Sequence, residues 1–113
     1  MYRGSPGDFD SESNLYYPTS SSVSRIEEFS KIKNLEFLKE DSDIRAVKLF
    51  GDNVLVTLYG MKSIGIWDLV KEERLFSAEA KTDIHEFMPY LRDGSLTIYF
   101  TDSEGNFGYF TNT

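Results

Sequence analysis

The residues of this chain whose side chains could do acid–base or nucleophilic chemistry are few and scattered. The single histidine, His85, lies between Ile84 and Glu86 in a segment that favours a β-strand. A histidine in such a setting is far more often structural than a general base. Serine is abundant, but no serine stands in the pattern of a nucleophile elbow. The sequence therefore predicts no catalytic residue.

Acidic residues that could bind a metal are better explained as turns and loop ends. Asp41 and Asp43 could act as a pair of carboxylates, but a solvated helix end is the simpler interpretation. Residues 102–106 (DSEGN) resemble the start of a calcium loop, yet the remaining ligands and the glutamate at the twelfth position are missing. No glycine-rich phosphate motif occurs. We expect no metal, no cofactor and no small-molecule substrate, and we expect that the chain is not an enzyme.

The composition is that of one small domain. The chain has 113 residues and a formal net charge of −7, from 12 basic and 19 acidic residues, and domains typically hold about 100–200 residues. No apolar stretch is long enough for a membrane span, and the first ten residues lack the apolar core of a secretory signal. The absence of cysteine suits a reducing compartment. We expect an intracellular protein, cytoplasmic or nuclear, that does not bind membranes.

A helix is predicted after a polar tail. Residues 1–13 are rich in glycine, serine and acidic residues and predict a flexible tail. Over residues 25–38 apolar side chains recur at helical spacing, and Ser24 stands three residues before Glu27, as in a capping box. The apolar side chains expected on the buried face of this helix are Ile26, Phe29, Ile32 and Leu35.

Strands are predicted on both sides of this helix. In one of them Val54, Val56 and Leu58 share a face, and this wholly aliphatic face is the better candidate for the core. Runs of apolar and β-branched residues favour strands at residues 14–17, 44–50, 54–59 and 83–88, the last ending at Pro89, and a hairpin at residues 95–100 and 106–110.

Residues 61–75 (MKSIGIWDLVKEERL) fit two interpretations. As a helix over residues 63–74, the segment would be capped by Ser63, and its apolar residues would fall at helical spacing. Gly65 opposes this helix by about 1 kcal/mol relative to alanine. As a strand, residues 64–67 would be extended and a turn would follow. Periodicity alone does not decide between the two for so short a run.

With the helical interpretation the element order is βαββαβ, and the chain resembles an RNA recognition motif (RRM). NLYYPTS resembles the first strand with its hexamer signature, DIRAVKLF resembles the second strand, and VTLYGMKSIGIW resembles the junction of the third strand and the second helix. DIHEFMP and SLTIYF resemble the linker that follows the first RRM in multi-RRM meiotic-regulator proteins. The resemblance implies an α+β fold: a ferredoxin-like sandwich over residues 14–90, with a C-terminal β-hairpin extension over residues 91–113.

The RRM resemblance also implies an RNA-binding surface on the sheet. Tyr16 matches the stacking aromatic of the hexamer, and the octamer aligns so that Asn53 and Leu55 take its two stacking positions. Base–aromatic stacking carries much of the affinity in such modules, and an acidic chain repels a polyanion. The implied function is therefore weak or accessory binding of single-stranded RNA. The residues expected to contact RNA are Tyr16, Lys48, Asn53, Leu55 and Thr57.

The strand interpretation leads to a second resemblance. DIRAVKLF and DIHEFMPY begin at residues 43 and 83, and IGIW at residues 64–67 matches FGYF at residues 107–110 in character. A period near 40 residues with Trp67 followed by aspartate is similar to a blade of a WD-repeat propeller. Fewer than two such blades are expected to fit in the chain, so it would supply part of a propeller. This resemblance implies an all-β fold. The alternative function is a module that binds a protein partner or forms a homodimer without binding RNA, either as a degenerate RRM or as a piece of a WD-type propeller.

Overall fold

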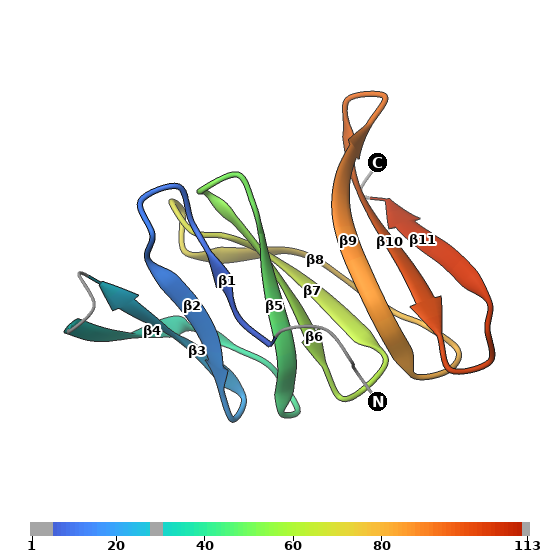
Figure 1. The fold of residues 1–113 in the computed structure, drawn as a ribbon, viewed down its shortest axis with the longest axis horizontal. Helices are drawn as coiled ribbons and strands as arrows, with labels where there is room; N and C mark the ends of the chain where they lie inside the picture. The colour runs from blue at the N-terminus through green and yellow to red at the C-terminus, as the bar shows by residue number, and fades with distance from the viewer. Residues whose placement is uncertain (1–5, 28–30, 112–113) are drawn as a thin grey trace.

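The chain forms β-sheets throughout its described part. The computed structural model describes residues 6–27 and 31–111, and within these residues it contains eleven strands in three antiparallel sheets, which we number in chain order (Figure 1). None of these residues forms a helix that could cross a membrane. Sheet 1 contains β1 (Asp8–Phe9), β2 (Leu15–Thr19), β3 (Ser22–Glu27) and β4 (Lys31–Lys39). Sheet 2 contains β5 (Ile44–Phe50), β6 (Val54–Tyr59), β7 (Ser63–Asp68) and β8 (Glu73–Glu79). Sheet 3 contains β9 (Ile84–Arg92), β10 (Ser95–Asp102) and β11 (Phe107–Thr111).

Each sheet is a meander in which strands that follow one another in the chain are paired. Figure 1 shows the three sheets side by side, with sheet 2 between the other two. The chain before β2 binds the free edge of β5: the Val47 N–H donates to the carbonyl oxygen of Pro6, and the Leu49 N–H donates to the carboxylate of Asp8, each at 2.9 Å. Successive antiparallel sheets of this kind are typical of the blades of a β-propeller.

Two apolar cores lie between the sheets. Sheet 2 contributes to both of them, which explains why β6 and β7 are buried over almost their whole length. The predicted core face with Val54, Val56 and Leu58 is confirmed, because these side chains pack against sheet 3. The core between sheets 1 and 2 contains Tyr16, Val23, Leu35, Leu38, Ile44, Val47, Leu55 and Trp67. The core between sheets 2 and 3 contains Ala46, Val56, Leu58, Ile64, Ile66, Ala80, Ile84, Phe87 and Ile98.

The predicted α+β fold, a ferredoxin-like sandwich, is wrong, because no helix forms in the described residues. Residues 25–38 lie in β3 and β4, and Phe29 of the predicted helix face falls outside the described part. The expectation of fewer than two blades is wrong as well. One meander takes only about 40 residues, since β5 begins at Ile44 and β9 begins at Ile84.

A bulge in β4 changes the side-chain pattern at the end of the segment predicted as a helix, whereas Ile26 and Ile32 of the predicted buried face pair as ordinary strand neighbours and Ile32 is exposed. The pairing of β3 with β4 shifts register in this region, and β4 contains extra residues that have no partner on β3. The hydroxyl of Ser22 donates to the carbonyl oxygens of Leu35 and Leu38, at 3.3 and 2.7 Å, and so binds backbone groups within the bulge. The bulge breaks the two-residue alternation, so Leu35 and Leu38 are both buried although they lie three residues apart.

The predicted helix over residues 63–74 is also wrong, because this segment contains β7 and the start of β8. Both faces of β7 are buried, and a strand buried on both faces shows no apolar–polar alternation. The strand ends in a turn at Asp68, whose carboxylate accepts hydrogen bonds from the backbone N–H groups of Val70 and Lys71 at 2.8 and 2.9 Å. The strand interpretation of this segment is therefore the correct one.

The other predicted strands are confirmed. Residues 44–50 and 54–59 form β5 and β6, and the first strand and the C-terminal hairpin also form where they are predicted. The strand β9 does not end at Pro89 but continues to Arg92. Because β9 is an edge strand of sheet 3, the missing N–H of Pro89 leaves no gap in the pairing with β10. In the segment predicted as a tail, Asp8–Phe9 forms β1.

Candidate protein interface

A buried carboxylate lies at the centre of sheet 2. Glu40, in the connection between β4 and β5, accepts a hydrogen bond from the indole N–H of Trp67 at 2.9 Å and one from the hydroxyl of Thr57 at 2.5 Å, both on Oε2. The guanidinium of Arg74 forms an ion pair with the other oxygen, Oε1. Both carboxylate oxygens are therefore paired, which offsets the cost of burying the charge. We call these four residues the Glu40 network.

Three strands of sheet 2 supply the partners of Glu40, namely β6 with Thr57, β7 with Trp67 and β8 with Arg74. Gly65 leaves the space that the carboxylate needs, because a Cβ atom there would overlap Glu40 Oε2 and lie 2.8 Å from the Thr57 hydroxyl. The Arg74 guanidinium also lies 5.0 Å from the centroid of the Trp67 ring. The network joins three strands to the connection that leads into β5.

Two titratable side chains, one in sheet 1 and one in sheet 2, have raised pKa values. Desolvation raises the pKa of Tyr59, and the charges of Asp41 and Glu79 raise it further. The hydrogen bond with Tyr16 is the main cause that raises the pKa of Arg25. Neither group can exchange a proton at pH 7. Within the described residues, no three side chains of His, Asp or Glu gather where they could hold a metal ion.

Sheet 3 repeats the backbone geometry of sheet 2 without the carboxylate. The Glu40 N–H donates to the carbonyl oxygen of Ser21 at 2.9 Å, and the Ala80 N–H donates to that of Lys62 at 2.8 Å. These two hydrogen bonds join the connection before each sheet to a turn of the preceding sheet. Ala80 therefore takes in sheet 3 the place that Glu40 takes in sheet 2.

Aromatic rings fill the centre of sheet 3. Phe100 pairs with Gly108 across β10 and β11, as Thr57 pairs with Gly65 across β6 and β7. The ring of Phe100 stacks on that of Phe110 with 4.8 Å between the centroids. A Cβ atom on Gly108 would lie 2.9 Å from the Phe100 ring, so the ring uses the space that the glycine leaves. We call Phe100 and Phe110 the aromatic stack.

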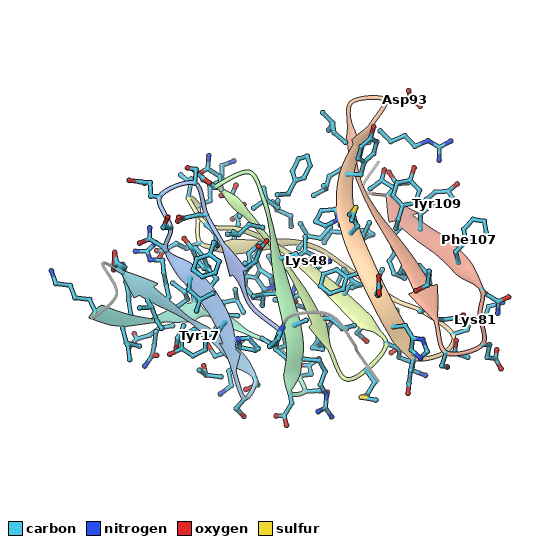
Figure 2. All side chains as sticks on the ribbon, in the orientation of Figure 1. Tyr17, Lys48, Lys81, Asp93, Phe107 and Tyr109 are labelled. Atoms are coloured by element: carbon cyan, nitrogen blue, oxygen red, sulfur yellow. The ribbon has the colours of Figure 1, made fainter. Side chains whose placement is uncertain are left out.

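Large apolar side chains face solvent on the side of sheet 3 that points away from sheet 2. Phe107 and Tyr109 project from β11, with 86% and 54% of their surface exposed (Figure 2). The Tyr109 ring lies 6.1 Å from the Tyr99 ring on β10, which lies 6.2 Å from the Tyr90 ring on β9. We call this set the aromatic face: Met88, Tyr90, Tyr99, Phe107 and Tyr109.

Strand alternation and register together create the aromatic face. Residues two positions apart share a face of a strand, and both β9 and β11 contribute two such residues. The register places Met88, Tyr99 and Tyr109 opposite one another in a row across three strands. The Arg92 guanidinium lies 5.6 Å from the centroid of the Tyr109 ring. A contiguous apolar surface of this kind marks an interaction site in a protein.

The residues predicted to contact RNA do not lie on one exposed face. Leu55 and Thr57 are fully buried on β6, and Tyr16 is buried in the core between sheets 1 and 2. Asn53 is exposed in the turn before β6. Lys48 lies between sheets 2 and 3, with its ammonium group 5.2 Å from the centroid of an aromatic ring of β9 (Figure 2). Base stacking needs an exposed ring, and the structure does not bring these five residues together.

Sequence reasoning missed both the Glu40 network and the aromatic face. Nothing near Glu40 in the sequence marks it for burial, because its partners are 17, 27 and 34 residues away. The aromatic face leaves a local signal, two aromatic residues, Phe107 and Tyr109, on either side of Gly108. That signal becomes a surface only when the register of three strands is known.

No family model and no curated protein sequence matches this chain. Chains of solved structures do match it, and one of them belongs to the crystal structure of a mitotic checkpoint complex. This match has a TM-score of 0.62 and a sequence identity of 16%, and it covers 86% of this chain and 33% of that chain. An identity of this size shows the fold alone. The present chain spans about a third of the length of the chain that it matches.

These findings overturn the RRM resemblance and the RNA binding derived from it. The described residues form three antiparallel sheets, and the matching chain confirms an all-β fold of this kind. Three successive antiparallel sheets agree with the all-β alternative that the sequence left open. Nothing in the structure or in the comparisons indicates an RNA-binding function.

Proposed function

We propose that this chain is a non-catalytic protein–protein interaction module, built from propeller-type sheets, and that its aromatic face contacts the partner. The observation that carries the proposal is the exposure of four large side chains, Met88, Tyr90, Phe107 and Tyr109, around the half-buried Tyr99 on one side of sheet 3. Tyrosine, phenylalanine and methionine are enriched at protein interfaces relative to the rest of a protein surface. Tyrosine is also among the residues that contribute most to binding energy.

The support beneath the aromatic face suits it for binding. The strand β10 is paired on both sides, and Phe87 and Ile98 are buried on the opposite side of the same sheet. A rigid backbone loses little conformational entropy when a partner binds, so more of the contact energy appears as affinity. The matching chain comes from a protein complex, which agrees with a role in protein assembly.

The buried polar centre of the molecule supports a non-catalytic role. Both oxygens of Glu40 are bound, one by Thr57 and Trp67 and the other by Arg74. A carboxylate in this state is closed to solvent and holds strands together, whereas a general base must reach a substrate proton. We therefore assign the Glu40 network to stability and the aromatic face to binding.

A retention experiment with matched variants tests this function. The immobilised wild-type chain and a double variant, Phe107→Ser with Tyr109→Ser, are exposed to extract of the source cells, and the retained proteins are quantified by mass spectrometry. We expect at least one protein to be retained by the wild type and reduced about tenfold by the double variant, as for loss of an interface hot spot.

The matched control is Val70→Ser, which removes an exposed apolar side chain in the turn after β7, outside sheet 3. This control should retain the same proteins as the wild type. Circular dichroism should show the same strand content in all three chains, because the replaced side chains are exposed. Equal retention by the wild type and the double variant would contradict the proposal.

A further inference from the structure

We infer that the partner of the aromatic face is sheet 1 of a second copy of this chain, so that copies associate head to tail. This inference rests on the proposed function and names its partner. Sheet 1 would contact the aromatic face through a row of apolar side chains that crosses all four of its strands. We call this set the apolar row: Phe9, Leu15, Ile26 and Ile32.

The apolar row faces away from sheet 2. Phe9 is opposite Leu15, Leu15 is opposite Ile26, and Ile26 is opposite Ile32, so each strand contributes one residue. The next residue of β2, Tyr16, is buried in the core against sheet 2, so its neighbour Leu15 points to the other side. Phe9 and Ile32, at the two ends of the row, are 59% and 65% exposed.

The aromatic face occupies positions that are buried in sheet 2. Val56 and Ile66 are opposite one another on β6 and β7, and both are buried in the core against sheet 3. Tyr99 and Tyr109 are opposite one another at the matching places of β10 and β11. Sheet 2 thus uses this face to bind the sheet that follows it, and in sheet 3 the same face is free of any sheet in the described chain.

The apolar row occupies the positions through which sheet 2 binds the sheet before it. Leu15 and Ile26 are opposite one another on β2 and β3, as Leu55 and Trp67 are on β6 and β7. Leu55 and Trp67 are buried in the core against sheet 1. The two end faces of the molecule therefore repeat the two halves of an interface that the chain already forms internally.

Charge also favours contact between these two faces. The chain is 27% charged, and the nine side chains of the two sets are uncharged, but Glu86 and Arg92 lie on the same side of β9 as Met88 and Tyr90 and border the aromatic face. An interface centred on these nine side chains would bury apolar surface and leave Glu86 and Arg92 at its solvent-exposed rim. Charged residues are depleted at the centres of protein interfaces.

The interface is heterologous, because sheet 3 of one copy meets sheet 1 of the next. Such an interface leaves a free aromatic face at one end of a pair and a free apolar row at the other. Further copies can therefore add until a ring closes. A variant that blocks one face should still bind through its other face, and this property makes the inference testable.

Two variants, each altered on one face, test the inference. Ile32→Lys places a charge on the apolar row and leaves sheet 3 intact, whereas Tyr109→Lys does the reverse. Analytical ultracentrifugation of the purified chains should show association of the wild type, and self-association about tenfold weaker or more for each variant alone. An equimolar mixture of the two variants should form a dimer and nothing larger, because each supplies the face that the other lacks.

A second pair of variants, Phe9→Lys and Phe107→Lys, should behave in the same way, so that misfolding of one variant does not decide the result. Val70→Lys should associate like the wild type. A wild type that stays monomeric overturns the inference, and retention of another protein through the aromatic face would then leave the proposed function standing. Association of Ile32→Lys alone at wild-type strength also overturns it, since sheet 3 would be binding sheet 3. A mixture that stays monomeric beside an associating wild type overturns it as well.

Discussion

The first three strands of sheet 2 share their order and register with the three strands of sheet 3, but the centres of the two sheets are stabilised in opposite ways. In sheet 2 a charged side chain, Glu40, is buried with donors on three strands. In sheet 3 the equivalent residue is Ala80, and Phe100 and Phe110 stack in the space between the strands. One backbone arrangement therefore accepts either a polar network or an aromatic stack.

The two centres depend on their neighbours to different degrees. The Glu40 network is stable only while every partner is present, because an unpaired buried charge is costly. The aromatic stack has no such requirement, since ring packing weakens gradually as contacts are lost. A change in sheet 2 should therefore have a larger effect than the equivalent change in sheet 3.

Removal of the carboxylate should produce the largest effect. We expect Glu40→Ala to lower the free energy of unfolding by about 3–5 kcal/mol, because it leaves the Trp67 indole, the Thr57 hydroxyl and the Arg74 charge without their acceptor. Urea denaturation followed by Trp67 fluorescence measures this. The control is Glu36→Ala, on an exposed position of β4, which should change stability by less than about 0.5 kcal/mol. Equal effects of the two variants would show that the network does not stabilise sheet 2.

Placing the carboxylate in sheet 3 should also destabilise the protein. We expect Ala80→Glu to cost on the order of 2–4 kcal/mol, because Ala80 lies in an apolar core and the rings of Phe100 and Phe110 offer no donor. The same denaturation experiment measures the change, with Ala80→Leu as a control for size. If Ala80→Glu were no worse than Ala80→Leu, charge would not be the reason for the difference between the sheets.

The two central glycines should differ in their tolerance of a methyl group. Gly65→Ala should cost about 2 kcal/mol, because the new Cβ would meet the fixed carboxylate of Glu40 and the Thr57 hydroxyl. Gly108→Ala should cost less than about 1 kcal/mol, because the Phe100 ring is half-buried and can shift. Thermal unfolding of both variants gives the comparison. A larger loss of stability for Gly108→Ala than for Gly65→Ala would show that the aromatic stack is less tolerant of a methyl group than the Glu40 network.

The smallest effect concerns pH and the turn between β10 and β11. Desolvation raises the pKa of Asp102, but hydrogen bonds from the backbone N–H groups of Asn106 and Glu104 outweigh it and leave the pKa below its usual range. A carboxylate with a lowered pKa stabilises the fold at pH values above its unfolded-state pKa of about 3.9. This stabilisation is lost as the pH falls through the folded-state pKa.

Asp102→Asn keeps the acceptor oxygen but not the charge, so its urea midpoint should fall less steeply than that of the wild type below about pH 4. In sheet 2 the corresponding turn joins β6 and β7, and its residues 60–62 include no acidic side chain. This turn therefore has no carboxylate that could make stability depend on pH in the same way. If the urea midpoints of the wild type and of Asp102→Asn fell in parallel with pH, Asp102 would not contribute a pH dependence to sheet 3.

The repeats in the sequence predicted more of the fold than its helical periodicity did. The repeated segments at residues 43 and 83 correspond to β5 and β9, and the segments at 64–67 and 107–110 lie in β7 and β11. Both predicted helices failed for physical reasons that a local pattern does not contain. The first predicted helix includes the bulged strand β4, and the second includes β7, which is buried on both faces.

The candidate interface was less predictable than the strands. Strand alternation shows that Phe107 and Tyr109 share a face, but not whether that face is covered. Their exposure depends on whether another sheet packs against sheet 3, which is a property of the tertiary structure, and none does within the described residues. Glu40 could not be recognised either, because burial of a carboxylate depends on donors that are distant in the chain.

The meander topology has a consequence for how the native state opens. Every strand pairing joins neighbours along the chain, so each sheet can open without breaking the pairing of another. Sheets 1 and 3 each share one core with the rest of the molecule, whereas sheet 2 shares two. We therefore expect opening to proceed from the two ends toward the middle. The backbone amides of β6 and β7 should be the last to exchange their hydrogens with solvent, because both cores must separate before water reaches them.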